Sequence, residues 1–176
     1  ERNGVEMYDV YTGFKWIANV MRENEGKKNY IGGGEESYGF LCEDFVRDKD
    51  AVSACVILAE IAAWAKDQGL SLYQLLQKIY VEYGFSKEKG ISVVKKGKSG
   101  AEEIEAMMKK FRENPLTEIA GSKVTYFYDY STLKGKDYAE NETVTLDMPT
   151  TSNVLQYFTE DNTKVSIRPS GTEPKI

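Results

Sequence analysis

The residues with the clearest capacity for chemistry lie near the end of the chain, in the run Arg168-Pro169-Ser170-Gly171-Thr172-Glu173-Pro174-Lys175. A guanidinium can bind two oxygens of a phosphate at once, hydroxyls can donate to the others, and a glycine lets backbone N–H groups approach an anion. The run follows Val165–Ile167, a sequence typical of a β-strand. It therefore predicts a phosphate-binding loop. The alternative is a plain turn, because proline, serine and glycine are ordinary turn residues.

A second polar loop follows three consecutive glycines, Gly32 to Gly34. The glycines allow a tight backbone turn, and the next residues, Glu35, Glu36 and Ser37, offer acceptors to the neighbouring hydroxyls of a polyol such as a sugar. It is not a dinucleotide-binding glycine motif, because acidic residues replace the phosphate-facing positions and no helix follows directly. The alternative is a glycine hairpin with solvated glutamates. In either case we expect the Glu35 carboxylate to be exposed.

A third group, Arg47-Asp48-Lys49-Asp50, precedes an apolar helix and can place a cation beside a ligand. For Asp48 and Asp50, helix capping and surface charge are the favoured interpretation. A hydroxyl-binding loop, a cationic group and a phosphate loop in one chain predict a sugar phosphate as the ligand.

Composition excludes several function classes. The 176 residues contain no histidine, which removes histidine-based nucleophile pairs and histidine-ligated metals from what this chain does unaided. The two cysteines, Cys42 and Cys55, form no zinc-binding pair and fit a reducing cytoplasm. The net charge of −5 argues against a nucleic-acid surface, and no run of about twenty apolar residues predicts a membrane span. The chain begins at Glu1 without a leader pattern, so we expect a fragment.

Periodicity in the first half predicts a short strand at 29–31 and helices at 13–24, 51–66 and from about 71 to 84. Thr12 and Asp50 are predicted N-caps, and Ser71 with Gln74 forms a predicted capping box. The helix at 51–66 carries apolar residues on more than one face, so we expect it to be buried on most sides.

The pattern changes after a polar connector at Gly84–Gly90. A strand is predicted at 91–94, then a helix that opens with a capping box at Ser99 and Glu102 and stops at Asn114-Pro115. Further strands are predicted at 123–130, 143–148, 154–159 and 164–168.

Four motifs together carry a family resemblance. Thr12–Lys15, Gly34–Ser37, Arg47–Asp50 and Arg168–Lys175 occur in the order, and at about the spacing, seen in the α-D-phosphohexomutase family of phosphoglucomutases and phosphomannomutases. The whole chain resembles the C-terminal part of such an enzyme.

The resemblance implies a fold class of α/β to α+β. Residues 1–86 would form the C-terminal part of mutase domain 3, a mixed α/β domain with the sugar-binding loop. Residues 87–176 would form domain 4, a smaller α+β domain of the TATA-binding-protein-like kind with the phosphate-binding loop, incomplete at its C-terminus.

The resemblance also implies roles for individual residues. Glu35 and Ser37 resemble the ligands of sugar hydroxyls, and Lys49 resembles a charged substrate contact. The clamp on the nonreacting phosphate would comprise Arg168, Ser170, Gly171 and Thr172. No residue of this chain matches the catalytic serine or the metal loop of the family, and Thr12–Lys15 receive no role.

The implied activity is interconversion of hexose 1-phosphate and hexose 6-phosphate through a bisphosphate. The implied cofactors are Mg²⁺, held outside this chain, and a sugar bisphosphate activator. The implied partners are the hexose phosphate and domains 1 and 2 of the same polypeptide, and the isolated chain should be inactive. Two alternatives stay open. One is a phosphopentomutase, because Glu35–Gly39 and Val81–Gly84 resemble the family branch that includes bacterial phosphoglucomutases and animal phosphopentomutases. The other is a noncatalytic sugar-phosphate-binding module.

Overall fold

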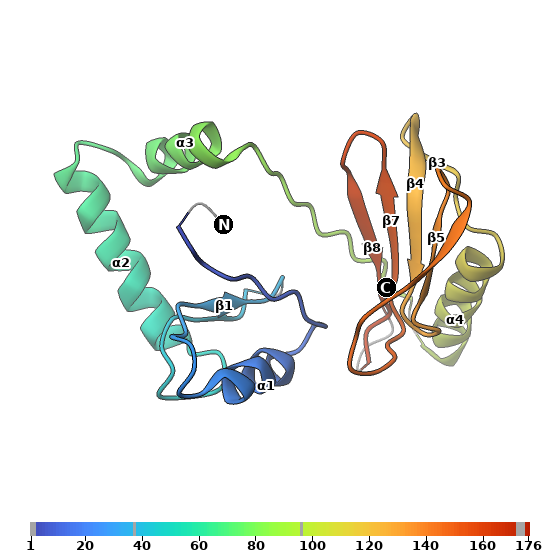
Figure 1. Cartoon of the computed structure of the whole chain (residues 1–176), viewed down its shortest axis with the longest axis horizontal. Coiled ribbons are helices and arrows are strands. Elements are labelled where there is room, and N and C mark those ends of the chain that lie inside the picture. The colour runs from blue at the N-terminus through green and yellow to red at the C-terminus, as the bar shows by residue number, and fades with distance from the viewer. Residues whose placement is uncertain (1–2, 37, 96, 172–174) are drawn as a thin grey trace. The chain divides into compact units, whose positions relative to one another are not determined.

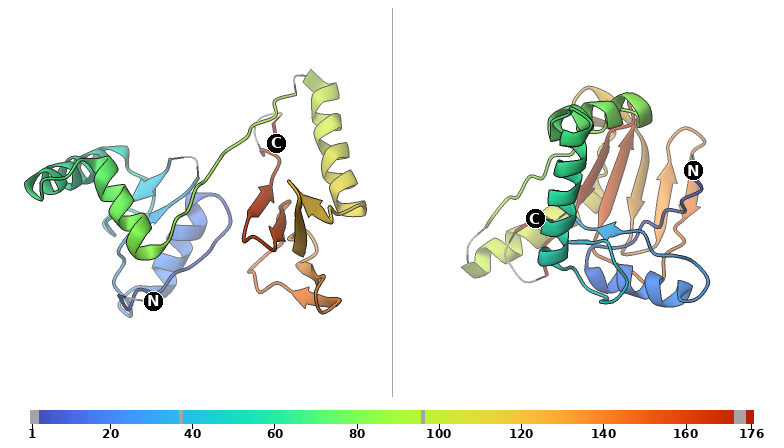
Figure 2. Two further views of the ribbon diagram at one scale, coloured as in Figure 1. Left: turned by 90° about the horizontal axis from the view of Figure 1, so that it is seen from above. Right: turned by 90° about the vertical axis from the view of Figure 1, so that its left-hand side faces the viewer.

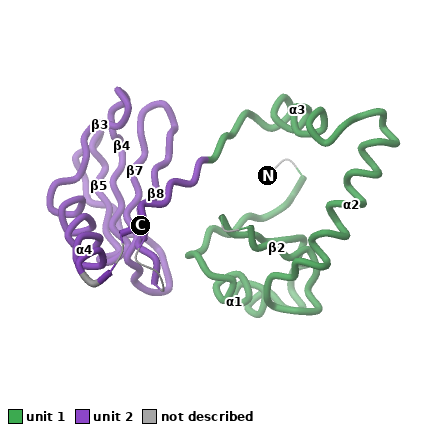
Figure 3. Tube along the Cα trace, turned by 180° about the vertical axis from the view of Figure 1, so that it is seen from behind, with its two compact units in different colours: residues 1–88 green, residues 89–176 purple. Residues whose placement is uncertain are grey.

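A computed structural model describes residues 3–36, 38–95, 97–171 and 175–176. The chain divides into two compact units, Glu1–Glu88 and Lys89–Ile176, coloured separately in Figure 3. The division lies within the polar connector at Gly84–Gly90. Each unit is described by itself.

Helices make up most of the regular secondary structure of the first unit (Figure 1). Its elements are α1 (Phe14–Asn24), β1 (Gly33–Gly34), β2 (Phe40–Leu41), α2 (Ala51–Asp67) and α3 (Leu72–Tyr83). The two strands form an antiparallel hairpin in which Gly34 lies opposite Phe40. The strand predicted at 29–31 is wrong. Tyr30 is tied to β2 by its side chain, since its hydroxyl donates to the Leu41 carbonyl at 2.9 Å.

Two of the predicted helix starts in this unit are confirmed. The Asp50 carboxylate accepts from the Val52 N–H and caps α2. Ser71 and Gln74 form the reciprocal capping box of α3. The predicted Thr12 cap is wrong, because the N-cap of α1 is Gly13, which has no side chain to accept a hydrogen bond.

The prediction that α2 is buried on most sides is wrong for the described chain. Ala65 is its buried residue, whereas Val52, Leu58 and Trp64 are exposed. Two elements pack against α2. β2 lies near its beginning and α3 lies near its end (Figure 1). A helix with apolar residues on more than one face is therefore left largely uncovered.

The second unit is an antiparallel sheet with one helix, α4 (Gly97–Glu113). Its strands are β3 (Glu118–Ile119), β4 (Ser122–Asp129), β5 (Lys134–Asp137), β6 (Glu142–Thr145), β7 (Leu155–Thr159) and β8 (Lys164–Ile167). The order across the sheet is β6-β5-β4-β7-β8, and β3 pairs with β4. Figure 2 shows α4 along one face of the sheet.

The core of this unit lies between α4 and the two central strands. It comprises Met108, Val124, Phe127, Leu155 and Tyr157. The Tyr157 ring lies 4.9 Å from the Phe127 ring, and its hydroxyl donates to the Phe111 carbonyl at 3.2 Å. Burial raises the pKa of Tyr157 to about 12. The packing of the Tyr157 ring and the hydrogen bond of its hydroxyl therefore hold β7 against α4.

Two local predictions in the second unit are wrong, and two short strands, β3 and β5, are not among the predicted ones. Residues 91–94 form no regular strand. Their pairing with described residues is limited to an isolated bridge between Val94 and Lys175 and to backbone hydrogen bonds between Val93 and Ile176. The helix begins at Gly97, so Ser99 lies inside it and the predicted capping box is wrong. The short polar strand β5 was not predicted, since Lys134–Asp137 lacks the apolar alternation of a strand.

No helix in the described part of the chain combines the length and the apolar character needed to cross a bilayer.

Candidate functional site

The candidate sugar loop connects β1 to β2. The hairpin is closed at its neck, where the Glu35 N–H donates to the Gly39 carbonyl at 2.9 Å. Tyr38 adopts a positive φ of 66° and projects into solvent. Ser37, the predicted hydroxyl ligand, lies outside the described residues. Glu35 and Glu36 therefore follow directly after β1, at the start of this loop.

The prediction that Glu35 is exposed is wrong. Its side chain is only 8% exposed, and its Oε1 lies 3.3 Å from the Lys49 Nζ. A carboxylate removed from water needs a cation or hydrogen-bond donors to stay charged. The structure therefore brings two of the predicted site residues, Glu35 and Lys49, into direct contact.

Lys49 belongs to the loop between β2 and α2. Its ammonium lies 3.8 Å from Asp48 and 5.7 Å from the centre of the Phe14 ring on α1. The loop is anchored behind it, because the Asp50 N–H donates to the Phe40 carbonyl at 3.2 Å. The hydrogen bond from the Val52 N–H lowers the pKa of Asp50, which supports the capping role. The side chain of Lys49 remains half exposed.

The segment Thr12–Lys15 leads into α1 beside the loop. The Thr12 hydroxyl lies 3.4 Å from both carboxylate oxygens of Glu36. The Lys15 ammonium lies 5.0 Å from the centre of the Trp16 ring. Thr12 thus sits against the sugar loop rather than capping the helix.

The candidate phosphate loop follows β8 in the second unit. Arg168 is exposed, Ser170 is half-buried, and Thr172 lies outside the described residues. The Ser170 N–H donates to the Lys175 carbonyl at 2.8 Å. Beyond it, Val93 and Ile176 exchange two backbone hydrogen bonds of 2.8 and 3.1 Å. The loop is therefore fixed at both ends, by β8 and by the segment before α4.

Gly171 lies at the open part of this loop. A Cβ built on it would have no atom within 4 Å, and its φ is not in the left-handed region. Neither crowding nor backbone conformation within the described residues requires glycine there. The predicted reason, close approach of an anion to the backbone, remains an expectation.

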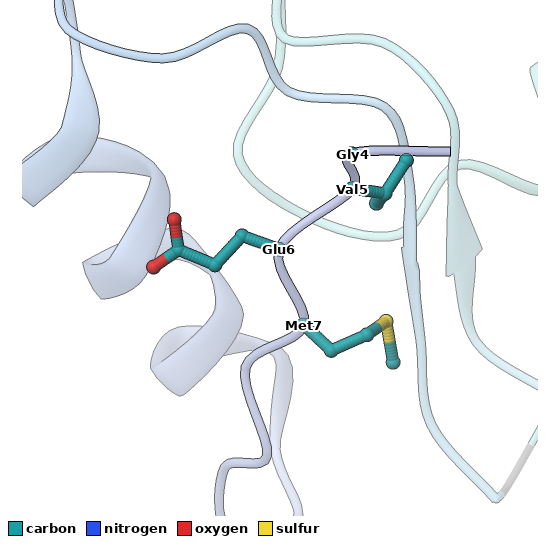
Figure 4. A pocket seen from close by; sticks show the side chains of 4 residues that line it. All are labelled: Gly4, Val5, Glu6 and Met7. Carbon is teal, nitrogen blue, oxygen red and sulfur yellow. The ribbon is translucent and has the colours of Figure 1, made fainter. Parts of the chain in front are cut away.

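Two hollows in the surface of the first unit are lined by described residues. One of about 510 Å³ is lined by Gly4, Val5, Glu6 and Met7, and Figure 4 shows Glu6 extending to one side of the chain and Val5 and Met7 to the other. Glu6 is engaged by Lys28, whose hydrogen bond lowers the pKa of that carboxyl. This hollow is therefore formed by the extended N-terminal segment, which contains none of the predicted site residues.

The second hollow, of about 430 Å³, lies along one face of α1. It is lined by Lys15, Ala18, Asn19, Arg22, Arg47 and Asp48. It includes part of the cationic group predicted from the sequence, but neither Glu35 nor Lys49 lines it.

Metal binding finds no support in the described part of this chain. Among those residues, no three or more Cys, Asp or Glu side chains gather as metal ligands.

The contact that sequence reasoning missed is that of Gly39 with the Glu35–Lys49 pair. A Cβ on Gly39 would lie 2.6 Å from the Glu35 Oε1 and 2.8 Å from the Lys49 Cδ. The sequence signals this contact only through the glycine at the end of the acidic loop. A plain hairpin also favours a glycine at that position, so the signal is not specific.

The first unit matches a known family. Residues 1–83 match the model of the phosphoglucomutase/phosphomannomutase α/β/α domain III. Its helices and strands agree with the α/β class predicted from the sequence.

The whole chain is similar to proteins named phosphoglucomutase. It is 36% identical over 176 residues to that of Staphylococcus haemolyticus strain JCSC1435, covering 100% of this chain and 32% of that protein. It is 40% identical over 174 residues to that of Staphylococcus aureus strain bovine RF122 / ET3-1, covering 99% of this chain and 31% of that protein. The chain thus spans about a third of the length of the curated relatives it matches. The chain belongs to the phosphoglucomutase/phosphomannomutase family, and residues 1–83 correspond to its domain III.

Proposed function

We propose that this chain is the substrate-binding C-terminal part of a phosphosugar mutase that interconverts hexose 1-phosphate and hexose 6-phosphate. The observation that carries the proposal is similarity along the whole chain, across both candidate loops, to proteins named phosphoglucomutase. Polar loops of two kinds, one acidic and one with a guanidinium and hydroxyls, suit the two ends of a sugar phosphate.

In this proposal the first unit binds the sugar. Glu35 and Ser37 accept and donate hydrogen bonds to neighbouring hydroxyls, and the positive charge of Lys49 lies beside the Glu35 carboxylate. The contact between Glu35 and Lys49 supports this assignment, because a carboxylate held in one orientation can discriminate between hydroxyl positions.

The second unit binds the phosphate that does not react. Arg168 offers a planar pair of donors, Ser170 and Thr172 offer hydroxyls, and Gly171 leaves the backbone accessible. The hydrogen bonds at the two described ends of this segment support the proposal, because ends that are already held leave less ordering to oppose binding.

The chemical step lies with residues that this chain does not contain. A phosphoserine would transfer its phosphoryl group to the sugar monophosphate, and the resulting bisphosphate would turn and return its other phosphate to the serine. The part of this chain is to hold the sugar in either orientation. Mg²⁺, held elsewhere in the polypeptide, would supply charge neutralisation of the phosphoryl group, and a sugar bisphosphate would serve as activator.

The test compares two proteins under one assay. The full-length polypeptide that contains this chain should convert glucose 1-phosphate to glucose 6-phosphate when Mg²⁺ and glucose 1,6-bisphosphate are supplied. Residues 1–176 alone should give no conversion above buffer. Turnover by the isolated chain would refute the division of labour, and a full-length protein inactive on hexose and pentose phosphates would refute the mutase assignment.

A further inference from the structure

Gly39 occupies a position where no side chain fits beside Glu35 and Lys49. Its Cβ would lie 2.6 Å from the Glu35 Oε1 and 2.8 Å from both the Glu35 Cγ and the Lys49 Cδ. Gly39 is itself buried and does not have a positive φ, so its backbone conformation alone would accept alanine. The requirement for glycine therefore comes from the carboxylate and ammonium side chains that lie against it.

Gly32, in the same hairpin, gives the contrast. A Cβ there would lie 3.5 Å from the Leu41 carbonyl oxygen and 3.7 Å from the Phe40 ring, which is ordinary van der Waals contact. The two glycines differ in what a methyl group would displace: Gly39 faces the Glu35–Lys49 pair, and Gly32 faces the backbone and ring of β2.

The ion pair itself is asymmetric. Glu35 is nearly covered, whereas Lys49 is half exposed, with its ammonium 3.3 Å from the Glu35 Oε1 and 5.7 Å from the centre of the Phe14 ring. The ring attracts the cation to this position, and the cation attracts the carboxylate.

We propose that Gly39 and Lys49 are positioning residues for Glu35. Gly39 provides the space into which the carboxylate folds, and Lys49 fixes its orientation through Oε1 and acts on the ligand only through Glu35. The inference rests on the proposed function, in which Glu35 binds sugar hydroxyls.

The first experiment is Gly39→Ala in the full-length polypeptide, with Gly32→Ala as the matched control. The atoms that must move to admit the new methyl group belong to flexible side chains, so the fold should survive while Glu35 is displaced. We expect KM for glucose 1-phosphate to rise about tenfold with kcat changed less than about threefold, as for a lost binding contact. Gly32→Ala should keep both constants within about twofold of wild type. Equal effects of the two substitutions would overturn the role of Gly39.

The second experiment is a double-mutant cycle between Lys49 and Glu35. Lys49→Ala should lower kcat/KM about fivefold in the wild-type background and by less than about 1.5-fold in the Glu35→Ala background, because a residue that acts through Glu35 has no effect once Glu35 is gone. Lys49→Arg, which retains the charge, should restore at least half of the lost kcat/KM.

The outcomes separate this inference from the function on which it rests. If Lys49→Ala costs the same factor in both backgrounds, Lys49 contacts the ligand directly, and the positioning role is overturned while the mutase assignment stands. If Glu35→Ala leaves kcat/KM unchanged, the sugar-ligand assignment fails, and the positioning role fails with it.

Discussion

The two units differ in how completely they bury their apolar side chains. The second unit encloses Leu155 and Tyr157 completely between α4 and the sheet. The first unit has a small cluster of Phe14, Met21 and Leu41, while α2 and α3 expose apolar side chains along their length. A sheet covered by a helix encloses a core within a single unit, whereas a helix with apolar residues on more than one face needs partners on several sides.

The difference in burial also indicates that the first unit needs further chain to cover its apolar helix α2. The chain spans about a third of the length of the relatives it matches. The family model that matches residues 1–83 is that of an α/β/α domain. Among the described residues of the first unit, the strands are two residues long and cannot cover α2. We therefore expect chain beyond residues 1–176 to cover α2. The predictions below test the contrast between the two units, from the largest expected effect to the smallest.

The largest effect should follow from removing the centre of the second core. Tyr157→Ala leaves a cavity beside Phe127 and should cost about 3–5 kcal/mol of unfolding free energy. Both tryptophans, Trp16 and Trp64, lie in the first unit. In residues 1–176, the urea midpoint followed by tryptophan fluorescence should therefore stay unchanged. The midpoint followed by the sheet signal in circular dichroism should shift to lower urea concentration. A matching shift in both signals would show that the units unfold together.

Alkaline pH should weaken the same core through Tyr157. Its pKa is raised from 10.0 to about 12 in the folded chain. The unfolded chain therefore loses this proton first, and the stabilisation present below pH 10 should decline by about 2–3 kcal/mol as the pH rises to 12. Urea midpoints between pH 9 and 12 measure the decline. Tyr157→Phe should flatten it, and an unchanged slope in that variant would assign the effect to other tyrosines.

The sugar loop of the first unit is tested by Glu35→Ala in the full-length polypeptide. Loss of hydrogen bonds made by a charged acceptor should lower kcat/KM by about 1.5–3 kcal/mol in transition-state free energy. Glu43→Ala, which removes an exposed carboxylate from the following loop, is the matched control and should change little. A value within about twofold of wild type for Glu35→Ala would contradict the assignment.

The phosphate loop of the second unit is tested by Arg168→Lys in the full-length polypeptide. Lysine keeps the charge but loses the planar pair of donors, so kcat/KM should fall about tenfold, equivalent to about 1.4 kcal/mol. The loss should be equal with glucose 1-phosphate and glucose 6-phosphate, because one clamp serves both orientations. Lys164→Arg on β8 is the control, because it also exchanges one exposed cationic side chain for another but lies outside the phosphate loop. A defect in one direction only would refute a shared clamp.

The smallest effect should come from α2 in the isolated chain. Val56 is 54% exposed, so Val56→Ser should change the unfolding free energy of residues 1–176 by no more than about 0.5 kcal/mol. Leu41→Ala, at a fully buried position of the same unit, should cost about 2–5 kcal/mol in the same tryptophan-fluorescence assay. In the full-length polypeptide Val56→Ser should cost more than about 1 kcal/mol if chain beyond residue 176 or before residue 1 covers α2. An equal, small cost in both proteins would mean that α2 stays exposed.

Local sequence determined the features whose energies are local. Asp50 was predicted as the cap of α2, and Ser71 with Gln74 as the capping box of α3, because these hydrogen bonds span only two or three residues. The family and its mixed α/β class were predicted from four short motifs in the correct order, and the comparisons confirm them. The identities of the ligand residues in those motifs remain predictions.

Tertiary structure decided what depends on distant neighbours. Lys134–Asp137 is a strand because β4 and β6 pair on both sides of it, and Gly135 is needed there because a Cβ would lie 2.4 Å from the Tyr128 ring. The burial of Glu35 depends on Lys49, fourteen positions away, and on the absence of a side chain at Gly39. Hydrophobic pattern and local hydrogen bonding reveal neither contact, because each arises only when the chain folds back on itself and excludes water from a particular pair of side chains.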